Sequence, residues 1–391
     1  MSPLANAYVE PERMNAPETF YPLHVWVCDR CFLVQLEEFA SPETMFSSDY
    51  AYFSSYSDSW LAHCRAYVEM IVGRLGLDRT TNVVELASND GYLLQYFKER
   101  GIPVLGVEPA ANVAQVAIEH GIPTTVAFFG EATARRLCAD GVRPRLLLGN
   151  NVLAHVPNLN DFVRGMALLL ADDGVITMEF PHLMRLMELN QFDTIYHEHF
   201  SYFSFITVDS VFRRHGLVVF DVEEIPTHGG SLRIYARHAR GDSNRIEPPA
   251  VALRAREEES GFGRLEHYLT FGPRAERTKW ALLEYLIDAR RRGECVVGYG
   301  AAAKGNTLLN YCGIRTDLLD YVVDRSPRKQ GRYLPGTHIP IHVPERIRET
   351  RPDAVLILPW NVKEEVMCQM THVREWGARF VVPIPEVTVY P

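Results

Sequence analysis

The sequence predicts an α/β protein with two sheet-containing domains and a small irregular N-terminal module. Between residues 67 and 240, short apolar runs such as VVELA (83–87) and VITMEF (175–180) alternate with amphipathic helical segments. The alternation resumes with CVVGYG at 295–300. Buried strands that alternate with helices form parallel sheets covered on both faces. The N-terminal stretch is rich in aromatic residues and polar breaks, and it shows no long helical period.

The predicted domain boundaries follow the changes in this pattern. We expect the N-terminal module over residues 1–66, a central domain over 67–240 and a C-terminal α/β domain over 241–391. A polar stretch rich in Arg and Glu, at about 250–292, is expected to be helical. With 47% hydrophobic residues, the chain has enough apolar material for two or three cores.

The composition limits the classes of partner. A formal net charge of -9 at pH 7 disfavours nucleic acid, whose phosphates are bound by clustered Lys and Arg. No apolar run approaches the roughly 20 residues that cross a bilayer, and the N-terminus lacks the pattern of an export signal. We therefore expect a cytoplasmic protein without a membrane partner, whose 7 scattered cysteines are mostly reduced thiols.

Small polar and acidic residues follow the expected strand at 83–87 and its neighbours. Ligands of open parallel sheets bind at the carboxyl ends of strands, so a nucleotide is expected here. Glu108 ends the next strand, 23 residues after Glu85, and is placed to accept hydrogen bonds from ribose hydroxyls. Asp90 disfavours a pyrophosphate but suits the ammonium and sulfonium charges of S-adenosylmethionine, which we expect as the cofactor. The expected cofactor-binding residues are Glu85, Ser88, Asn89, Asp90, Glu108, Pro109, Asn150 and Asn151.

The segment DTIYHEHFSY (193–202) carries the densest reactive chemistry. It contains Tyr196, Glu198 and His199, while His155 follows the strand that ends at the two asparagines, so all four are expected to face one crevice. Removal of a proton from carbon needs a base whose pKa is near the working pH, and histidine is the usual choice. Two alternatives remain open: the His-Glu-His triplet could bind a metal, or the aromatic residues and histidines could form a packed core between domains.

A glycine-rich loop, GYGAAAKGNT (298–307), follows an expected strand and opens an expected helix. Glycines let the backbone approach phosphate oxygens, and Lys304 adds a positive charge, so an anion site is expected. The next strand ends in Asp324, which suits a ribose, and a nicotinamide dinucleotide remains an alternative ligand. Arg325 and Lys329 are placed to complete a diphosphate pocket, unless they belong to a solvated face.

Several motifs together resemble a known family over nearly the entire chain from residue 20 onward. They are VVELASNDGYLLQYF, GVEPAANVA, GNNVLAHV, EFPHLMRL, QFDTIYHEHFSYFS, THGGSLRIYA, GYGAAAKGNTLLNYCG and ILPWN. The chain looks like the three-domain deoxysugar carbon-3 methyltransferases of antibiotic sugar pathways. The resemblance implies an N-terminal zinc module, a central class I methyltransferase (Rossmann-like) domain that binds S-adenosylmethionine, and a C-terminal Rossmann-like domain that helps hold a thymidine-diphosphate 4-keto-6-deoxysugar.

The resemblance also assigns roles to individual residues. It implies that His199 takes the proton from carbon 3, which the adjacent ketone acidifies, and that Tyr196 and Glu198 orient this base and donate to the enolate. Tyr50 and His155 are expected to line the same site. Proximity and alignment would then supply much of the acceleration of methyl transfer. The expected substrate-binding residues are Tyr52, His182, Lys304, Asn306, Asp324, Arg325 and Lys329.

The zinc module departs from the family pattern. The family uses two Cys-x-x-Cys pairs, and this sequence contains one, Cys28 and Cys31, which are the candidate zinc ligands. Two thiolates do not close a tetrahedral structural site. We expect either that a first pair precedes this sequence or that the module folds without metal.

Two competing functions remain open at this point. A nucleotide-sugar oxidoreductase or epimerase would use the C-terminal glycine loop for a nicotinamide cofactor. A non-catalytic sugar-nucleotide binding protein would keep both clefts without the chemistry, but it would have no use for Tyr196, Glu198 and His199 beside the methyl-donor site. The leading prediction is a C-methyltransferase.

Overall fold

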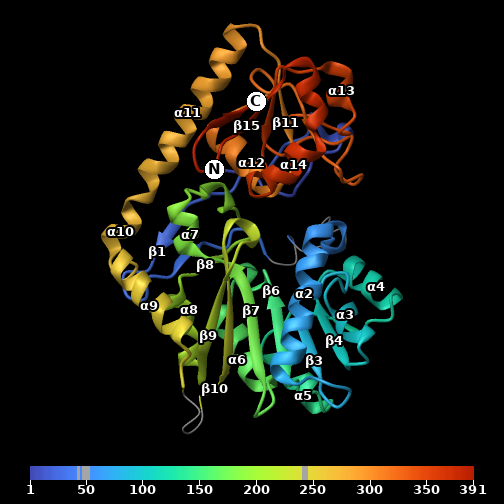
Figure 1. Cartoon of the computed structure of the whole chain (residues 1–391), viewed down its shortest axis with the longest axis vertical. Coiled ribbons are helices and arrows are strands. Elements are labelled where there is room, and N and C mark those ends of the chain that lie inside the picture. Colours follow the sequence, from blue (N-terminus) through green and yellow to red (C-terminus); the bar gives the residue numbers. More distant parts are fainter. Residues whose placement is uncertain (42–44, 46–52, 240–244) are drawn as a thin grey trace.

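The computed structural model describes residues 1–41, 45, 53–239 and 245–391. Tyr50 and Tyr52 lie outside the described residues, so their place in the site stays a prediction. The described strands form three sheets, of three, seven and six strands. Figure 1 shows the seven-stranded sheet in the lower half of the molecule and the six-stranded sheet in the upper half. The predicted α/β fold class is confirmed.

The central sheet has the strand order β5-β4-β3-β6-β7-β10-β9. All neighbouring strands pair in parallel except β10, which is antiparallel to both β7 and β9. The order reverses direction between β3 and β6, so a crevice opens at the carboxyl ends of these two strands. The strands are β3 (Val83–Leu86), β4 (Val104–Glu108), β5 (Thr124–Val126), β6 (Leu146–Asn150), β7 (Val175–Pro181), β9 (Leu217–Ile225) and β10 (Ser231–His238).

Helices cover both faces of the central sheet. One face packs against buried residues of α2 and α3, including Tyr67, Ile71 and Phe97. The other packs against α5, α6, α8 and α9, including Phe162 and Phe212. The helices are α2 (Asp58–Leu75), α3 (Leu94–Glu99), α4 (Ala111–Glu119), α5 (Glu131–Ala139), α6 (Leu159–Leu169), α7 (Leu183–Glu188), α8 (Phe205–Arg214) and α9 (Pro248–Ser260).

Local sequence signals explain where α2 begins and ends. The Ser57 side chain caps the first turn by accepting a hydrogen bond from the Trp60 amide at 3.3 Å. The helix ends at Gly76, whose left-handed conformation (φ 61°) is typical of a glycine C-cap. Although α2 starts inside the predicted N-terminal module, its buried face packs on the central sheet.

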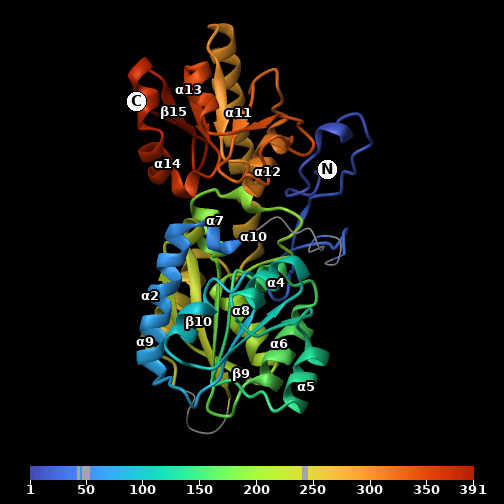
Figure 2. The same ribbon diagram turned by 90° about the vertical axis from the view of Figure 1, so that its right-hand side faces the viewer.

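The N-terminal module contributes a small antiparallel sheet in the order β1-β2-β8. Its strands are β1 (Val25–Val27), β2 (Val34–Leu36) and β8 (Ser201–Tyr202). The third strand comes from the predicted reactive segment, because Val34 pairs with Tyr202 and Gln35 with Ser201. The N-terminal module is therefore joined directly to the segment that contains His199. Figure 2 shows the N-terminal segment in blue beside both larger domains.

The C-terminal domain contains a six-stranded sheet in the order β13-β12-β11-β14-β15-β16, of which only β16 is antiparallel to its neighbour. The predicted helical stretch before it forms α9, α10 (Leu265–Leu269) and α11 (Phe271–Arg291), which run along one side of the molecule (Figure 1). The other elements are β11 (Val296–Tyr299), α12 (Ala303–Cys312), β12 (Val322–Val323), β13 (Ile341–His342), α13 (Arg346–Thr350), β14 (Ala354–Ile357), α14 (Lys363–Gln369), β15 (Arg379–Val382) and β16 (Thr388–Tyr390). Within the described ranges, no helix is long and apolar enough to span a bilayer.

Candidate functional site

A cavity of about 540 Å³ lies where the three parts of the chain meet. Its wall includes Asn6 and Ser54 from the N-terminal region, strand ends and loops of the central domain, and Ala302 from the C-terminal domain. Eleven of the predicted site residues line it: Asn89, Glu108, Pro109, Asn150, Asn151, His155, Tyr196, Glu198, His199, Lys304 and Lys329. The topology thus brings together side chains that are separated by up to 240 positions in the sequence (329 minus 89).

Glu108 ends β4 at the wall of this cavity. Its two carboxylate oxygens accept hydrogen bonds from the backbone amides of Asn89, at 3.0 Å, and Ala110, at 2.8 Å. Burial raises the pKa of Glu108 to about 7, although these two amides oppose the shift. Asn89 adopts a left-handed backbone conformation, with φ 48°, which is uncommon for a residue other than glycine. The loop is therefore bent so that its amide points at the carboxylate.

Asn89 and Asp90 tie the loop to the short helix η2 (Ser54–Tyr56). The Asn89 side-chain oxygen accepts from the Ser54 amide at 2.9 Å, and one oxygen of Asp90 accepts from the Ser55 hydroxyl at 2.5 Å. The other oxygen of Asp90 is buried and has no hydrogen-bond partner in the described part of the chain. A buried carboxylate oxygen without a partner is costly, so it is a natural contact for a cationic or hydrogen-bonding ligand.

Glu85 and Ser88 lie beneath this loop rather than in the cavity wall, and both are fully buried. Burial raises the pKa of Glu85 well above its ordinary value, so the carboxyl group is held uncharged. Ser88 packs against Gly106 of β4, where a Cβ atom would lie only 2.3 Å from the serine hydroxyl. Their assignment to the cofactor stays a prediction, and their observed place is in the support of the loop.

His199 is at the centre of the reactive cluster. Its Nδ1 lies 2.9 Å from the carbonyl oxygen of Thr194, and because a carbonyl only accepts, Nδ1 carries the proton and Nε2 of the neutral ring is free of one. The ring centroid lies 4.1 Å from that of Tyr196 and 4.7 Å from that of His155. Burial, with a further contribution from His155, holds the pKa of His199 well below its ordinary value. The imidazole is thus neutral and able to accept a proton at Nε2.

Glu198 is buried beside this histidine and is held by a residue that sequence reasoning missed. Its Oε1 accepts a hydrogen bond from the Asn6 side-chain amide at 2.6 Å. Burial raises the pKa of Glu198 to about 7, and the bond from Asn6 opposes that shift. The partners are 192 positions apart in the sequence, and no local pattern marks Asn6.

The chain around Asn6 is fixed by the C-terminal domain. The Asn306 side chain donates to the carbonyl oxygen of Ala5 at 2.6 Å, and the Tyr8 hydroxyl donates to that of Ala301 at 2.5 Å. Asn306 does not line the cavity in this structure, and its amide nitrogen is used for a main-chain contact. Its predicted role in substrate binding stays untested.

The metal interpretation of the His-Glu-His triplet has no geometric support. His197 Nε2 contacts the carbonyl oxygen of Pro22 at 3.0 Å, which directs this ring to the N-terminal module. His199 instead donates to Thr194. Among the residues that the structure describes, no group of three or more His, Cys, Asp or Glu side chains could hold a metal ion.

Cys28 and Cys31 lie in the turn between β1 and β2, where Cys28 is half-buried and Cys31 is exposed. Backbone amides of Cys31 and Arg30 hold the pKa of the Cys28 thiol below its ordinary value, which favours a thiolate. Two thiols are nevertheless too few for a tetrahedral zinc site, and the described residues supply no third ligand. The donor set seen here does not fit a complete zinc site.

Lys304 and Lys329 bring positive charge to the cavity wall. Lys304 Nζ donates to Asn361 Oδ1 at 2.7 Å and lies 4.5 Å from the centre of the Trp360 ring. Burial lowers the pKa of Lys304 to about 8, against an opposing effect of Asp193. Lys329 Nζ donates to the carbonyl oxygen of Ala301 at 2.9 Å.

The glycine loop itself is filled by protein contacts. Asp324 accepts from the backbone amides of Ala301, at 2.7 Å, and Ser326, at 2.8 Å, so the carboxylate predicted to hold a ribose binds its own loop. Gly300 packs against Pro359, and a Cβ atom there would lie 2.5 Å from the proline ring. Arg325 is exposed, with Nη1 3.9 Å from a carboxylate oxygen of Glu365. Neither Asp324 nor Arg325 lines the cavity.

His182, also predicted to bind substrate, is buried outside the cavity wall. Its Nε2 contacts Glu257 Oε1 at 2.6 Å, and Glu257 also accepts from the backbone amides of Phe205 and Ile206. This contact joins the end of β7 to α9 and to the first turn of α8. The observed surroundings of His182 are structural, and its predicted role stays untested.

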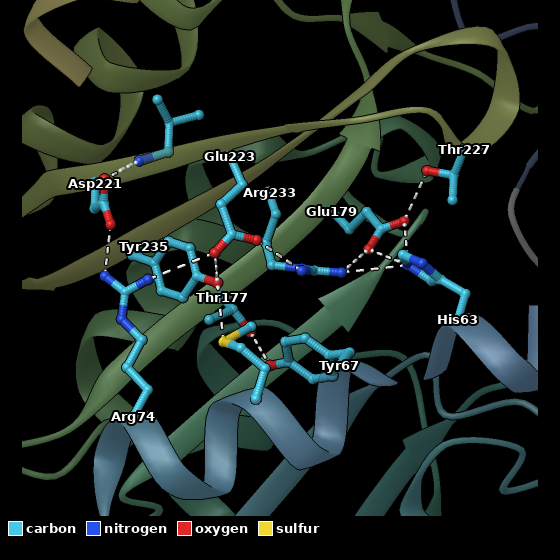
Figure 3. A network of polar contacts seen from close by, with 12 residues as sticks. His63, Tyr67, Arg74, Thr177, Glu179, Asp221, Glu223, Thr227, Arg233 and Tyr235 are labelled. Atoms are coloured by element: carbon cyan, nitrogen blue, oxygen red, sulfur yellow. Dashed lines mark hydrogen bonds and ion pairs between the residues drawn. The ribbon is translucent and has the colours of Figure 1, made fainter. Parts of the chain in front are cut away.

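Sequence reasoning also missed His228, which lines the cavity, and the network of charges behind it. Figure 3 shows Glu179 at the end of β7 in contact with His63 of α2 and Arg233 of β10. Arg233 continues to Glu223 of β9, with a nitrogen–oxygen distance of 2.9 Å. Both His228 and Arg233 belong to the motif THGGSLRIYA, which is the sequence signal that points to them.

The donor side of this cavity fits S-adenosylmethionine. Glu108 supplies a carboxylate at the end of β4, and the buried Asn150 side-chain nitrogen has no hydrogen-bond partner within the described ranges. Asp90 follows Asn89 but does not itself line the cavity, so its predicted contact with the cofactor stays a prediction. Glu108 matches the ribose hydroxyls and Asn150 the amino acid carboxylate of such a ligand in kind, and we expect them to hold it.

Three protein-family models match successive segments of the chain. Residues 1–46 match the family described as "Putative zinc binding domain", residues 60–222 match "Methyltransferase domain", and residues 226–385 match "C-methyltransferase C-terminal domain". None of these descriptions supports the nicotinamide-dependent oxidoreductase alternative, and the filled glycine loop agrees with its rejection.

A curated relative covers almost the whole chain. The C-methyltransferase NovU of Streptomyces niveus is 37% identical over 388 residues, which are 99% of this chain and 92% of NovU. Solved structures match more weakly. A Burkholderia thailandensis 1,6-didemethyltoxoflavin-N1-methyltransferase has a TM-score of 0.39 at 17% identity and covers 55% of this chain and 98% of its own. The PH0226 protein of Pyrococcus horikoshii has a TM-score of 0.39 at 15% identity and covers 48% and 95%. Both structural matches are too weak to inform the acceptor.

The predicted methyltransferase activity and its cofactor are confirmed by these matches. The alignment with NovU covers 99% of the chain and so runs through all three parts. The chain belongs to the family of S-adenosylmethionine-dependent C-methyltransferases that includes NovU.

Proposed function

We propose that this C-methyltransferase adds a methyl group to carbon 3 of a thymidine-diphosphate-linked 4-keto-6-deoxysugar, in the synthesis of an antibiotic sugar. The observation that carries the proposal is the single cavity that Glu108, His199 and Lys304 share. A nucleotide-linked keto sugar presents a carbon acid and a diphosphate on one molecule. The proposed site offers a base for the former and a cation for the latter.

His199 is proposed to remove the proton from carbon 3. The adjacent ketone acidifies this carbon, and the electron pair of the broken C–H bond enters the enolate. Because Nδ1 is held by Thr194, the proton is received at Nε2. Glu198, when ionised, stabilises the imidazolium that results, and such positioned proton transfer contributes roughly 10² to 10⁴ in rate. Tyr196, whose ring packs on His199, orients the base and is placed to donate to the enolate oxygen.

S-adenosylmethionine supplies an electrophilic methyl group on a sulfonium, so the new carbon–carbon bond forms as the sulfur–carbon bond breaks and the sulfonium charge is neutralised. Asn89, Glu108 and Asn150 are proposed to hold the donor, because they line the cavity beside one another at the ends of β3, β4 and β6. Apolar rings such as Phe129 and Trp60 line the cavity and would limit the access of water to the enolate.

Lys304 and Lys329 are proposed to bind the diphosphate. Both line the cavity from the C-terminal domain. Lys304 lies in the first turn of α12 and is held by Asn361, whereas Lys329 lies in a turn and is held by the carbonyl oxygen of Ala301. An anion beside Lys304 would reverse part of the effect of burial on its pKa, because an opposite charge favours the ammonium form.

The proposal is tested most directly by hydrogen exchange without the methyl donor. Incubation of the enzyme and S-adenosylhomocysteine with a thymidine-diphosphate 4-keto-6-deoxyhexose in D₂O is expected to place deuterium at carbon 3, as read by mass spectrometry and NMR. His199→Asn is expected to lower the exchange rate at least 100-fold while its affinity for S-adenosylhomocysteine stays within twofold. Exchange at an unchanged rate in this variant would show that another group is the base. No exchange and no methylation by the wild-type enzyme would show that the acceptor is of another class.

A further inference from the structure

The turn between β9 and β10 brings a third histidine to the cavity, and the proposed reaction does not use it. His228 lies in the short helix η5 (Thr227–Gly229) and has φ 55° and ψ 19°, in the left-handed region. Residues other than glycine adopt this conformation in only a few per cent of cases, although histidine does so more often than most, and the strain persists only where surrounding contacts impose it. Such positions concentrate in ligand-binding and catalytic sites.

Contacts from two domains impose the conformation of this turn. The Thr227 hydroxyl donates to Glu179 Oε1 at 3.0 Å, and the Gln191 side chain donates to the carbonyl oxygen of Gly229 at 2.7 Å. A Cβ atom on Gly229 would lie 2.6 Å from the ring of Trp360, which belongs to the C-terminal domain. These hydrogen bonds and packing contacts hold the turn that carries the His228 imidazole in one conformation.

Glu179 anchors this turn (Figure 3). Its carboxylate contacts His63 Nε2 at 3.0 Å and Arg233 Nη2 at 2.9 Å, besides the Thr227 hydroxyl. Burial alone would raise the pKa of Glu179, but His63 and Arg233 together hold it below its ordinary value. The carboxylate is thus ionised, and each of its neighbours is a donor.

The contact of His228 with Asn151 indicates which of the two ring nitrogens can donate a hydrogen bond to a ligand. The side-chain nitrogen of Asn151, which also lines the cavity, lies 3.5 Å from His228 Nε2. An amide nitrogen only donates, so Nε2 accepts and the proton of the neutral ring is on Nδ1. This Nδ1 is buried, as is the side-chain oxygen of Asn151, and neither atom has a hydrogen-bond partner in the part of the chain that is described. His228 and Asn151, which both line the cavity, thus each keep one polar atom whose bonding capacity is unused among the described residues.

The charged groups that affect His228 are those near the proposed acceptor site, which contains His199 and Lys304, and not those near the proposed donor site around Glu108. Burial lowers its pKa to about 4, and the charged or basic groups that contribute are Lys304, Glu179, His63 and His155. The pKa of Glu108 on the donor side responds instead to Asp90. His228 and Lys304 also both depress the pKa of His199. The third histidine thus lies within electrostatic reach of both the proposed base and the proposed diphosphate ligand.

We infer that His228 is a further acceptor-binding residue, whose Nδ1–H donates to a carbonyl or hydroxyl oxygen of the sugar while the Asn151 side-chain oxygen accepts from a neighbouring hydroxyl or amino group. The inference rests on the proposed function, because it takes the acceptor to carry adjacent oxygen or nitrogen substituents. Glu179 and Thr227 act as positioning residues through the turn.

Two substitutions test the contact without adding backbone strain. His228→Gly and His228→Asn both suit a left-handed conformation. Each is expected to lower kcat/KM for a thymidine-diphosphate 4-keto-6-deoxyhexose about 10- to 100-fold, as follows from leaving polar groups of a buried contact unpaired. The dissociation constant for S-adenosylhomocysteine, measured by calorimetry, is expected to stay within twofold. His120→Gln, at the exposed end of α4, is the matched control and is expected to change neither quantity.

The positioning role is tested by Thr227→Val, which keeps the imidazole but removes the bond to Glu179. We expect kcat/KM for the sugar to fall by a smaller factor than in His228→Gly, with unchanged affinity for S-adenosylhomocysteine. The inference is overturned if both His228 variants keep wild-type kcat/KM, or if they lose affinity for S-adenosylhomocysteine as strongly as activity, since His228 would then serve the donor. A wild-type enzyme that does not methylate this sugar refutes the proposed function itself, and this result is obtained before any variant is compared.

Discussion

Substitution of Asn6 is expected to impair catalysis from a part of the chain far from the reactive segment. Asn6 Nδ2 donates to Glu198 Oε1 at 2.6 Å, and this bond opposes the effect of burial, which raises the pKa of the carboxyl group to about 7. Hydrogen bonds to charged groups contribute about 1.5–3 kcal/mol. Asn6→Ala should therefore raise the pKa of Glu198 by about one to two units, at about 1.36 kcal/mol per unit.

The sign of the pH effect follows from the ionised form of Glu198, which stabilises the imidazolium of His199 in the proposed reaction. A higher pKa leaves less of this form at neutral pH, so the acidic limb of the kcat profile should move to higher pH by the same one to two units. At pH 7 the ionised fraction should fall from about one half to between about 9% and 1%, so the loss of rate should be about 5- to 50-fold. Asn6→Asp should be worse than Asn6→Ala, because a second carboxylate at this position repels the first.

The assay is methyl transfer followed between pH 5.5 and 9 for the wild type, Asn6→Ala and Asn6→Asp. Asn160→Ala, on the exposed face of α6, serves as the control and should leave the profile unchanged. Calorimetry with S-adenosylhomocysteine checks that the donor site is intact. An Asn6→Ala enzyme with an unmoved acidic limb and an unchanged kcat would refute the argument that Asn6 sets the charge of Glu198.

The remaining predictions concern the two binding regions and the fold. Glu108→Ala should weaken the affinity for S-adenosylhomocysteine about 10- to 100-fold, since hydrogen bonds to a carboxylate contribute about 1.5–3 kcal/mol. Calorimetry should show an unchanged affinity for thymidine diphosphate. Equal losses of affinity for both ligands would contradict separate subsites. The pKa of Lys304 is lowered to about 8, so its ammonium form is present below that pH and is lost above it. Thymidine diphosphate should therefore bind the wild type more weakly at pH 9 than at pH 7. The Lys304→Met variant should show no such pH dependence. Gly106→Ala should lower the free energy of unfolding by about 1–3 kcal/mol, since the added Cβ would lie 2.3 Å from the Ser88 hydroxyl. In the double variant with Ser88→Ala, a denaturant titration should show that part of this stability is restored. Gly73→Ala, at a position of α2 where no atom lies near the added Cβ, should instead stabilise the protein by about 0.5–1 kcal/mol. If Gly73→Ala and Gly106→Ala destabilised the protein equally, a steric clash would not be the reason for the effect at Gly106.

The strands that position the site could be predicted from sequence because their apolar runs are short, continuous and followed by polar residues. The apolar run VLGVE (104–108) predicts a strand, which forms as β4 with the same bounds and with Glu108 at its end. The apolar run LLDYVVD (318–324) also predicts a strand, but in the structure only Val322–Val323 pairs, as β12. Leu318 and Leu319 instead turn back to the carbonyl of Arg315, so their apolar side chains pack in a turn. A buried turn and a buried strand give the same apolar pattern.

Within the site, strand-end residues could be predicted because the topology of a parallel sheet gathers them at one edge. Asn6 could not, because its contact with Glu198 depends on how the N-terminal segment crosses the C-terminal domain. Asp324 has the sequence position of a ribose ligand, but its carboxylate is used by two amides of its own loop. Local sequence shows that an acid follows a strand, whereas the identity of its hydrogen-bond donor is decided by the tertiary fold.

Through strand β8, ligand binding at the reactive segment should also raise the stability of the sheet in the N-terminal module. Ser201 and Tyr202 complete the small sheet begun by β1 and β2, and they follow His199 by two and three positions. Any ligand that binds the folded reactive segment and not the opened one must also stabilise this sheet, by mass action. Acceptor occupancy should therefore be recorded as slower amide hydrogen exchange at Val34 and Gln35, on the neighbouring strand, even though neither residue lines the cavity.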